Sequence, residues 1–185
     1  MNEALIIQQT ITYVKETLTG AEGGHDWWHI ERVYNNARHI ASQENTNRLI
    51  VELGALLIIG HVEKIIRHIS FKGGNEQASF ASAELHVVQD ADRLDAMGAI
   101  GIARAFNYGG FKNRELYNPG IKPDMHMTKE TYRNSTAPTI NHFYEKLLLL
   151  KDRMNTETGR QMAEQRHQFM LHYLSRFYDE WDGLR

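Results

Sequence analysis

The sequence predicts an all-α protein, and three observations support this prediction. Only three of the 185 residues are proline, so long segments can form helices without a break. Hydrophobic residues recur at helical spacing in several segments, and no segment alternates strongly enough to predict a strand. The length favours a single domain spanning residues 1–185.

The first two helices follow from hydrophobic spacing. Residues 3–18 carry hydrophobic residues near helical spacing, and Gly20 lies beyond their end. From Asp26 onward, one hydrophobic stripe runs along a helix whose other faces are largely polar. The stripe consists of Ile30, Val33, Ala37, Ile40 and Ala41.

A third helix is expected over residues 47–69, and a fourth over residues 78–106. Hydrophobic residues cover more than one face of the third helix near residues 56–59, which indicates two joined patterns rather than one stripe. The fourth is rich in alanine and is interrupted by Gly98 and Gly101, small residues that let another backbone come close.

The rest of the chain predicts a loop and two further helices. Residues 107–135 are polar and lack a clean period, so we expect a functional loop that covers a site as a lid. A helix capped by Thr136 is expected to reach Met154, and a last helix capped by Asn155 or Thr156 follows it.

Composition narrows the class of protein. A net charge of −2 does not favour a nucleic-acid or anionic-membrane surface, and no hydrophobic run is long enough to span a bilayer. The absence of cysteine excludes disulfides and thiolate metal sites, and the N-terminal residues lack the features of a signal peptide. We therefore expect a cytoplasmic protein without membrane or nucleic-acid partners. The P-loop and Rossmann glycine motifs are missing too.

Two histidines near the start of the second helix form a candidate metal pair. His25 and His29 in "GHDWWHIERV" are spaced i, i+4, so a helix would place both imidazoles on one face. The alternative is a loop histidine followed by one between the hydrophobic stripe and the surface.

The segment "VVQDADRLDAMGAIGIARAF" places three acids in a hydrophobic helix. Carboxylates there are costly unless they are paired or bind a cation. Asp92 and Asp95 share a face, whereas Asp90 points away from Asp92. We favour a cation site, and the alternative is a network of ion pairs with Arg93 and Arg104.

Basic residues elsewhere are candidates for contacts with phosphate. In "HVEKIIRHISFKGG", Arg67 and Lys72 lie near a glycine turn, and His68 stands between them. Lys146 and Arg166 lie on the last two helices. For all five, the alternative is a solvated surface position.

Four segments of the chain together resemble the HD-domain metal-dependent phosphohydrolases, and the resemblance extends over about residues 20–175. These segments are "HDWWHIERV", "IIRHISFKGG", "DADRLDAMGAIGIAR" and "HFYEKLLLLKDRMNTETGRQMAEQR". More narrowly, these segments resemble the bacterial branch that acts as nucleoside triphosphate pyrophosphohydrolases or related phosphatases. The resemblance implies an all-α HD-domain helical bundle around one divalent metal ion, most often manganese, with nickel, iron, zinc or magnesium as alternatives. It assigns His29 and Asp92 to the metal.

The resemblance also implies roles for other residues. Asp95 would orient a ligand or act as a general base, while His68 and Arg93 would support catalysis. The residues expected to bind substrate are Arg67, Lys72, Tyr108, Tyr117, Lys146 and Arg166.

The sequence departs from the family at its defining feature. A His-Asp dyad should follow "VELGALL", but the chain continues "IIGHVEKII", and the family's next loop and short helix are missing as well. Either the molecule lacks the dyad, or a segment of the natural protein is missing from the sequence near residues 57–60.

The expected function is metal-dependent hydrolysis of nucleotides, with a nucleoside triphosphate giving a monophosphate and pyrophosphate. The alternatives are a catalytically inactive module that binds nucleotides or a partner protein, and a hydrolase acting on another phosphate ester. Hydrophobic helix surface such as "LLLL" at residues 147–150 would permit a homodimer, although a core helix explains it equally well.

Overall fold

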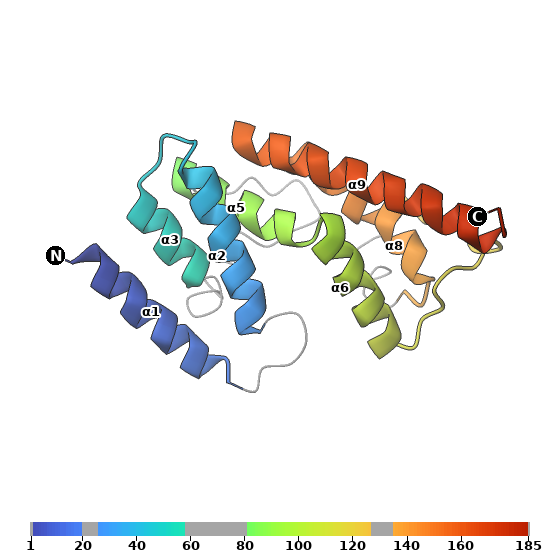
Figure 1. Cartoon of the computed structure of the whole chain (residues 1–185), viewed down its shortest axis with the longest axis horizontal. Coiled ribbons are helices and arrows are strands. Elements are labelled where there is room, and N and C mark those ends of the chain that lie inside the picture. The colour runs from blue at the N-terminus through green and yellow to red at the C-terminus, as the bar shows by residue number, and fades with distance from the viewer. Residues whose placement is uncertain (1, 20–25, 58–80, 127–134, 185) are drawn as a thin grey trace. The chain divides into compact units, whose positions relative to one another are not determined.

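The computed structural model describes residues 2–19, 26–57, 81–126 and 135–184, and all regular structure in these ranges is helical (Figure 1). This confirms the all-α prediction. The helices are α1 Glu3–Thr17, α2 Trp27–Ala41, α3 Arg48–Leu56, α5 Ala83–Asp95, α6 Gly98–Phe111, α8 Thr139–Glu145, the 3-10 helix η1 Leu147–Arg153, and α9 Glu157–Trp181.

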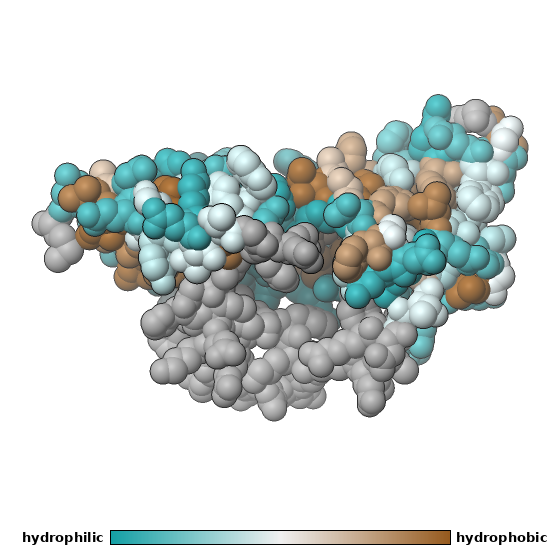
Figure 2. All heavy atoms as spheres, turned by 90° about the horizontal axis from the view of Figure 1, so that it is seen from below, coloured by the Kyte–Doolittle hydropathy of each residue, from teal (hydrophilic) through white to brown (hydrophobic). Residues whose placement is uncertain are grey.

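These helices group into two compact units, and the single domain over residues 1–185 stays a prediction. The first unit comprises residues 1–95 and 155–159, and the second comprises residues 96–154 and 160–185. None of the described helices is both long and hydrophobic enough to cross a membrane. Hydrophilic and hydrophobic residues are intermixed over the described surface in the view of Figure 2.

The first unit is organised around α2, which packs against both α3 and α5, while α1 lies on α3 (Figure 1). Ile30, Val33 and Ile40 of α2 are completely buried, which confirms the stripe expected from the sequence. Each such side chain contributes roughly 1.5–3 kcal/mol when it leaves water. Packing of this stripe therefore determines which face of α2 meets α5.

A buried carboxylate joins α2 to α3. Glu52 accepts hydrogen bonds from Tyr34 Oη at 2.7 Å and from Arg48 Nε at 2.6 Å, and Arg38 Nε lies 3.6 Å away. Burial opposes ionisation of Glu52, but the hydrogen bonds from Tyr34 and Arg48 outweigh it and lower the pKa of this carboxyl. Burial and the bond to Glu52 also raise the pKa of Tyr34 to about 12.

A second buried carboxylate holds the start of α9. Asp90 is fully buried and accepts hydrogen bonds from the backbone N–H of Asn155 at 2.9 Å and of Thr156 at 2.7 Å. The Thr156 hydroxyl donates to Asp90 at 2.8 Å and accepts a hydrogen bond from Gly159 N–H. Thr156 is therefore the N-cap of α9, one of the two residues predicted for that position. Expecting Asp90 in a cation-binding group of three acids was wrong, because backbone donors at a helix N-terminus occupy its oxygens.

Two helix boundaries near the middle of the chain differ from the expectations. The third helix ends at Leu56 instead of continuing to residue 69, and residues 58–80 lie outside the described ranges. The helix expected over residues 78–106 continues to Phe111, and it is interrupted before Gly98, as predicted: α5 ends at Asp95, and Gly98 opens α6 with φ +66°. Only glycine adopts this conformation without strain, so Gly98 marks the change of direction.

The predicted helix from Thr136 to Met154 was also wrong in its start and its continuity. The backbone of Pro138 is extended, with ψ 151°, and proline disfavours helical backbone in the residue before it, so α8 begins only at Thr139. Lys146 then has φ −144°, which ends α8 before the 3-10 helix η1.

The second unit has an aromatic core. Phe106 of α6 lies within 6.5 Å, ring centroid to centroid, of Phe143 of α8 and of Tyr173 and Phe177 of α9. Tilted and edge-on rings at this spacing add to the stabilisation from burial. These contacts join three helices that are separated in sequence.

Replacing Asp90 with alanine is expected to lower the free energy of unfolding by about 3 kcal/mol, because backbone donors at the start of α9 would lose their acceptor. Urea denaturation of the purified variant measures this loss. The matched control is Asp152→Ala: the Asp152 side chain is 70% exposed and pairs with Lys151 at the surface, so we expect a change below about 0.5 kcal/mol. Equal losses in both variants would contradict the role given to Asp90.

Replacing Glu52 with glutamine should destabilise the protein in a pH-dependent way. The folded-state pKa of Glu52 lies below its ordinary value of 4.5, so its ionised form stabilises the fold above pH 4.5, and this contribution is lost as pH falls through the folded-state pKa. We expect Glu52→Gln to cost about 1–2 kcal/mol at pH 7 and much less near pH 3. Denaturation curves of both proteins across this range measure the difference, and a difference independent of pH would contradict the assignment.

Candidate functional site

Packing of α2 against α5 brings three predicted site residues together in the first unit. His29 comes from α2 and is 4% exposed, while Asp92 and Asp95 lie one turn apart on α5. His29 Nδ1 lies 2.8 Å from Asp95 Oδ2, and His29 Nε2 lies 3.6 Å from Asp92 Oδ1. The two ring nitrogens therefore face two different carboxylates.

Asp95 is buried and contacts two residues of α2. It is 1% exposed and accepts hydrogen bonds from Arg32 Nε at 2.6 Å and Nη2 at 3.2 Å, as well as facing His29 Nδ1. The bond with Asp95 raises the pKa of Arg32, so a permanently charged guanidinium balances the buried carboxylate. Asp95 thus ties two neighbouring turns of α2 to the end of α5.

The contact with Asp95 determines which ring nitrogen of His29 carries the lone pair. An Nδ1–H that donates to a carboxylate leaves the lone pair of a neutral imidazole on Nε2. In His29 this is the nitrogen that faces Asp92. The same order of carboxylate, imidazole and metal is common in protein metal sites, where the outer carboxylate fixes the ring and strengthens the ligand.

Asp26, the second residue of the His-Asp dipeptide, has a structural role. Asp26 is the N-cap of α2, and its side chain accepts a hydrogen bond from the backbone N–H of His29 at 3.0 Å. Asp26 therefore begins the helix on which His29 stands. His25 lies outside the described residues.

His29 and Asp92 fit two positions in the coordination sphere of one divalent ion. Two ligand atoms that each lie about 2.1 Å from an ion stand roughly 3 to 3.5 Å apart, and the observed separation is 3.6 Å. This separation is too long for a hydrogen bond. The His29 side chain is buried, whereas the Asp92 side chain is 42% exposed.

No third ligand joins this pair among the residues that the structure describes, where no group of three or more His, Cys, Asp or Glu side chains is placed to hold a metal. The segment after "VELGALL", where the family's dyad is expected, falls in residues 58–80, outside the described ranges. His68, Arg67 and Lys72 lie in the same segment, so their expected roles stay predictions.

Arg93 is placed with the structural carboxylate of the first unit. Its Nη1 lies 3.1 Å from Asp90 Oδ1. The geometry therefore gives Arg93 a role in balancing the charge of Asp90, and a role in catalysis stays a prediction.

The remaining predicted substrate residues belong to the second unit. Tyr108 is half-exposed at the end of α6, with Arg114 above its ring. Tyr117 packs edge-on against Phe177 and Trp181, with ring centroids 6.0 and 5.1 Å away. Lys146 follows α8 directly, and Arg166 lies on α9 where its side chain packs near Gly98.

Arg32 is the site residue to which the sequence analysis gave no role. It stands three residues after His29, in the pattern His-x-x-Arg-Val, so a helix places it one turn from the imidazole. This spacing was the available signal. Its partner could not be inferred from spacing, because Asp95 is 63 residues away along the chain.

Proteins of similar sequence and structure are known. YpgQ of Bacillus subtilis (strain 168) is 35% identical over 216 aligned positions, which cover all of this chain and 98% of YpgQ. The crystal structure of an HD-superfamily hydrolase from Bacillus thuringiensis is 41% identical and has a TM-score of 0.77, covering 98% of this chain and 100% of that chain. The crystal structure of YpgQ in complex with ADP has a TM-score of 0.72 at 37% identity, covering 97% of each chain. No known family profile matches the chain.

The alignment with YpgQ is longer than this chain. It extends over 216 positions against the 185 residues of this chain, so 31 positions of YpgQ face no residue here. The similarity covers both units of the fold, and the chain belongs to the HD superfamily of hydrolases.

Proposed function

We propose that the protein is a divalent-metal-dependent phosphohydrolase that acts on nucleotides, releasing pyrophosphate from nucleoside triphosphates. The observation that carries this proposal is the convergence of His29 Nε2 and Asp92 Oδ1 at 3.6 Å, with the imidazole oriented by Asp95. Membership of a hydrolase superfamily supports the reaction class. The structure of a relative, YpgQ, with ADP supports a nucleotide as substrate.

His29 and Asp92 would hold the metal ion, and the ion would supply Lewis-acid polarisation of a phosphoryl oxygen. An imidazole with a carboxylate suits manganese, iron, nickel or zinc better than calcium, and we propose manganese as the preferred ion. Asp95 would keep the His29 ring in its binding orientation. Since its oxygens already face His29 and Arg32, this orienting role is favoured over that of general base.

Contacts with the phosphate groups require cations, for which we retain the candidates from the sequence. Arg67, His68 and Lys72 stand near a glycine turn, and Lys146 and Arg166 lie in the second unit. Positive side chains there would offset the charge on phosphoryl oxygens. A cytoplasmic location, the absence of nucleic-acid partners and a homodimer stay predictions.

A second candidate function is binding of nucleotides without hydrolysis. It is favoured by one observation, the absence of the His-Asp dyad after "VELGALL". Two protein ligands hold a divalent ion less tightly than the usual three or four. The two functions differ in one measurement: a binding module takes up nucleotide but releases neither pyrophosphate nor phosphate when manganese is added.

Replacing Asp92 with asparagine should weaken manganese binding at least tenfold and reduce hydrolysis of nucleoside triphosphates about a hundredfold, because a charged ligand is lost while the shape is kept. Calorimetric titration with manganese and an assay of pyrophosphate release measure the two effects. Asp152→Asn, at an exposed site in the second unit, is the matched control and should leave both unchanged. Unchanged metal binding and hydrolysis in Asp92→Asn would remove the central assignment.

Replacing Asp95 with asparagine separates its two candidate roles. An orienting residue predicts a 10- to 100-fold loss of manganese affinity, since His29 loses the partner that fixes its ring. A general base predicts unchanged affinity, with hydrolysis losing its rise on the acidic side of the pH profile, where the base becomes deprotonated. Circular dichroism should first confirm that the variant is folded, because Asp95 is buried with Arg32.

A further inference from the structure

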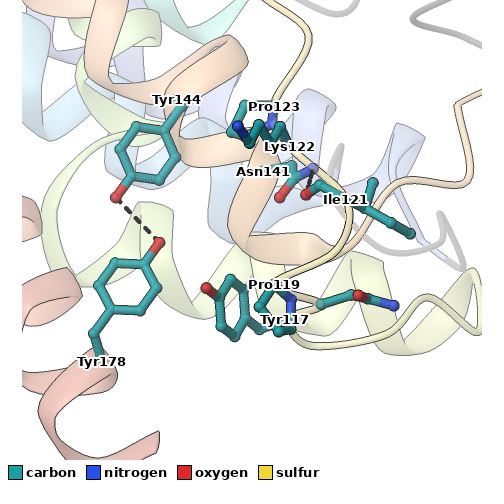
Figure 3. A pocket seen from close by; sticks show the side chains of 9 residues that line it. Tyr117, Pro119, Ile121, Lys122, Pro123, Asn141, Tyr144 and Tyr178 are labelled. Carbon is teal, nitrogen blue, oxygen red and sulfur yellow. Dashed lines mark hydrogen bonds between the residues drawn. The ribbon is translucent and has the colours of Figure 1, made fainter. Parts of the chain in front are cut away.

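None of the residues that line a cavity in the second unit is a candidate metal ligand. It has a volume of about 320 Å³ and lies between the chain around residues 117–123, α8 and α9 (Figure 3). Ligand pockets in proteins range from roughly 300 to 1,000 Å³, so this cavity suits a ring-sized group rather than a complete nucleoside triphosphate.

Flat hydrophobic surfaces form part of its wall. Tyr117 and Pro119 stand close together at one side of the cavity in Figure 3. The Tyr117 ring is held edge-on by Phe177 and Trp181, so its orientation does not depend on a ligand. A rigid aromatic face of this kind favours a planar aromatic ring as its occupant.

Polar groups at fixed positions complete the lining. Asn141 is 1% exposed, and its Nδ2 donates to the carbonyl oxygen of Ile121 at 3.1 Å, which leaves a second amide N–H for another acceptor. The hydroxyls of Tyr144 and Tyr178 lie 3.1 Å apart (Figure 3). When one of them donates to the other, the acceptor keeps its own O–H. Amide and hydroxyl groups together can serve both donors and acceptors on a heteroaromatic ring.

A single positive charge stands at this cavity. Of the described residues that line it, only Lys122 is charged, and its side chain is exposed. An exposed ammonium group beside an aromatic pocket fits a ligand with a ring and an anionic substituent, and the anionic part would remain in water. A nucleotide has this distribution of hydrophobic surface and charge.

We propose that this cavity binds the base of a nucleotide, with Tyr117 and Asn141 contacting the ring and Lys122 contacting a phosphate. The proposal rests on the proposed function for its ligand class. It goes further by naming the residues that would recognise the base.

The test is binding without metal, so that it does not depend on hydrolysis. In the presence of a chelator, AMP should bind the full chain in a calorimetric titration, and ribose 5-phosphate, which lacks the base, should not. Ile121→Trp, which places a large ring at the cavity, should weaken AMP binding by about tenfold or more. Lys122→Ala should weaken AMP binding by about tenfold while leaving adenosine binding unchanged. Lys112→Ala, at an exposed lysine outside the cavity, is the matched control and should bind AMP normally.

The proposal would be overturned if metal-free AMP binding were absent, if Ile121→Trp bound AMP as well as the unmodified protein, or if ribose 5-phosphate bound equally well. These results are independent of the proposed hydrolysis. AMP binding that responds to Ile121→Trp, in a protein that releases no pyrophosphate with manganese, supports the cavity assignment and contradicts the hydrolase. Hydrolysis that depends on Asp92, without an effect of Ile121→Trp on AMP binding, contradicts the cavity assignment alone.

Discussion

The buried carboxylate of Asp95 is the interaction on which the candidate site depends. A charge with 1% exposure is tolerated only when paired, and Arg32 and His29 both supply donors to it. Both partners come from α2, so the ion pair also fixes the position of α2 against α5. The orientation of the His29 ring, and with it the nitrogen available to a metal, follows from this single contact.

The three acids of α5 show how partners decide the role of a residue type. Asp90 is fully buried against the start of α9, where backbone N–H groups and the positive end of the helix dipole stabilise its charge. Asp95 is equally buried but has side-chain partners. Asp92 alone keeps a partly exposed side chain, and an accessible carboxylate beside an imidazole nitrogen is what a metal site requires.

The second unit is held together by aromatic packing, in contrast to the buried ion pairs of the first unit. Its described core is aromatic, with Phe106 and Phe143 packed against rings of α9, and the same cluster extends to Tyr117 beside the cavity. Rigid rings lose little conformational freedom when they meet a ligand, so a cavity with such walls is well prepared for a flat group. The stretch predicted as a lid therefore contributes an ordered wall around Tyr117.

The sequence by itself determined the helical class and the hydrophobic stripe of α2, and it limited the cap of α9 to Asn155 or Thr156, because these depend on local spacing and on residue type. The assignment of His29 and Asp92 to a metal came from the family resemblance. The motifs that carried the family resemblance are also local. The exact end of the third helix at Leu56, the left-handed backbone of Gly98 and the separation of Asp90 from the site came only from the tertiary structure. Each depends on contacts between residues distant in sequence or on backbone geometry that spacing does not encode. The pairing of Asp95 with Arg32 across 63 residues is the clearest case, since helix packing alone brings those two charges together.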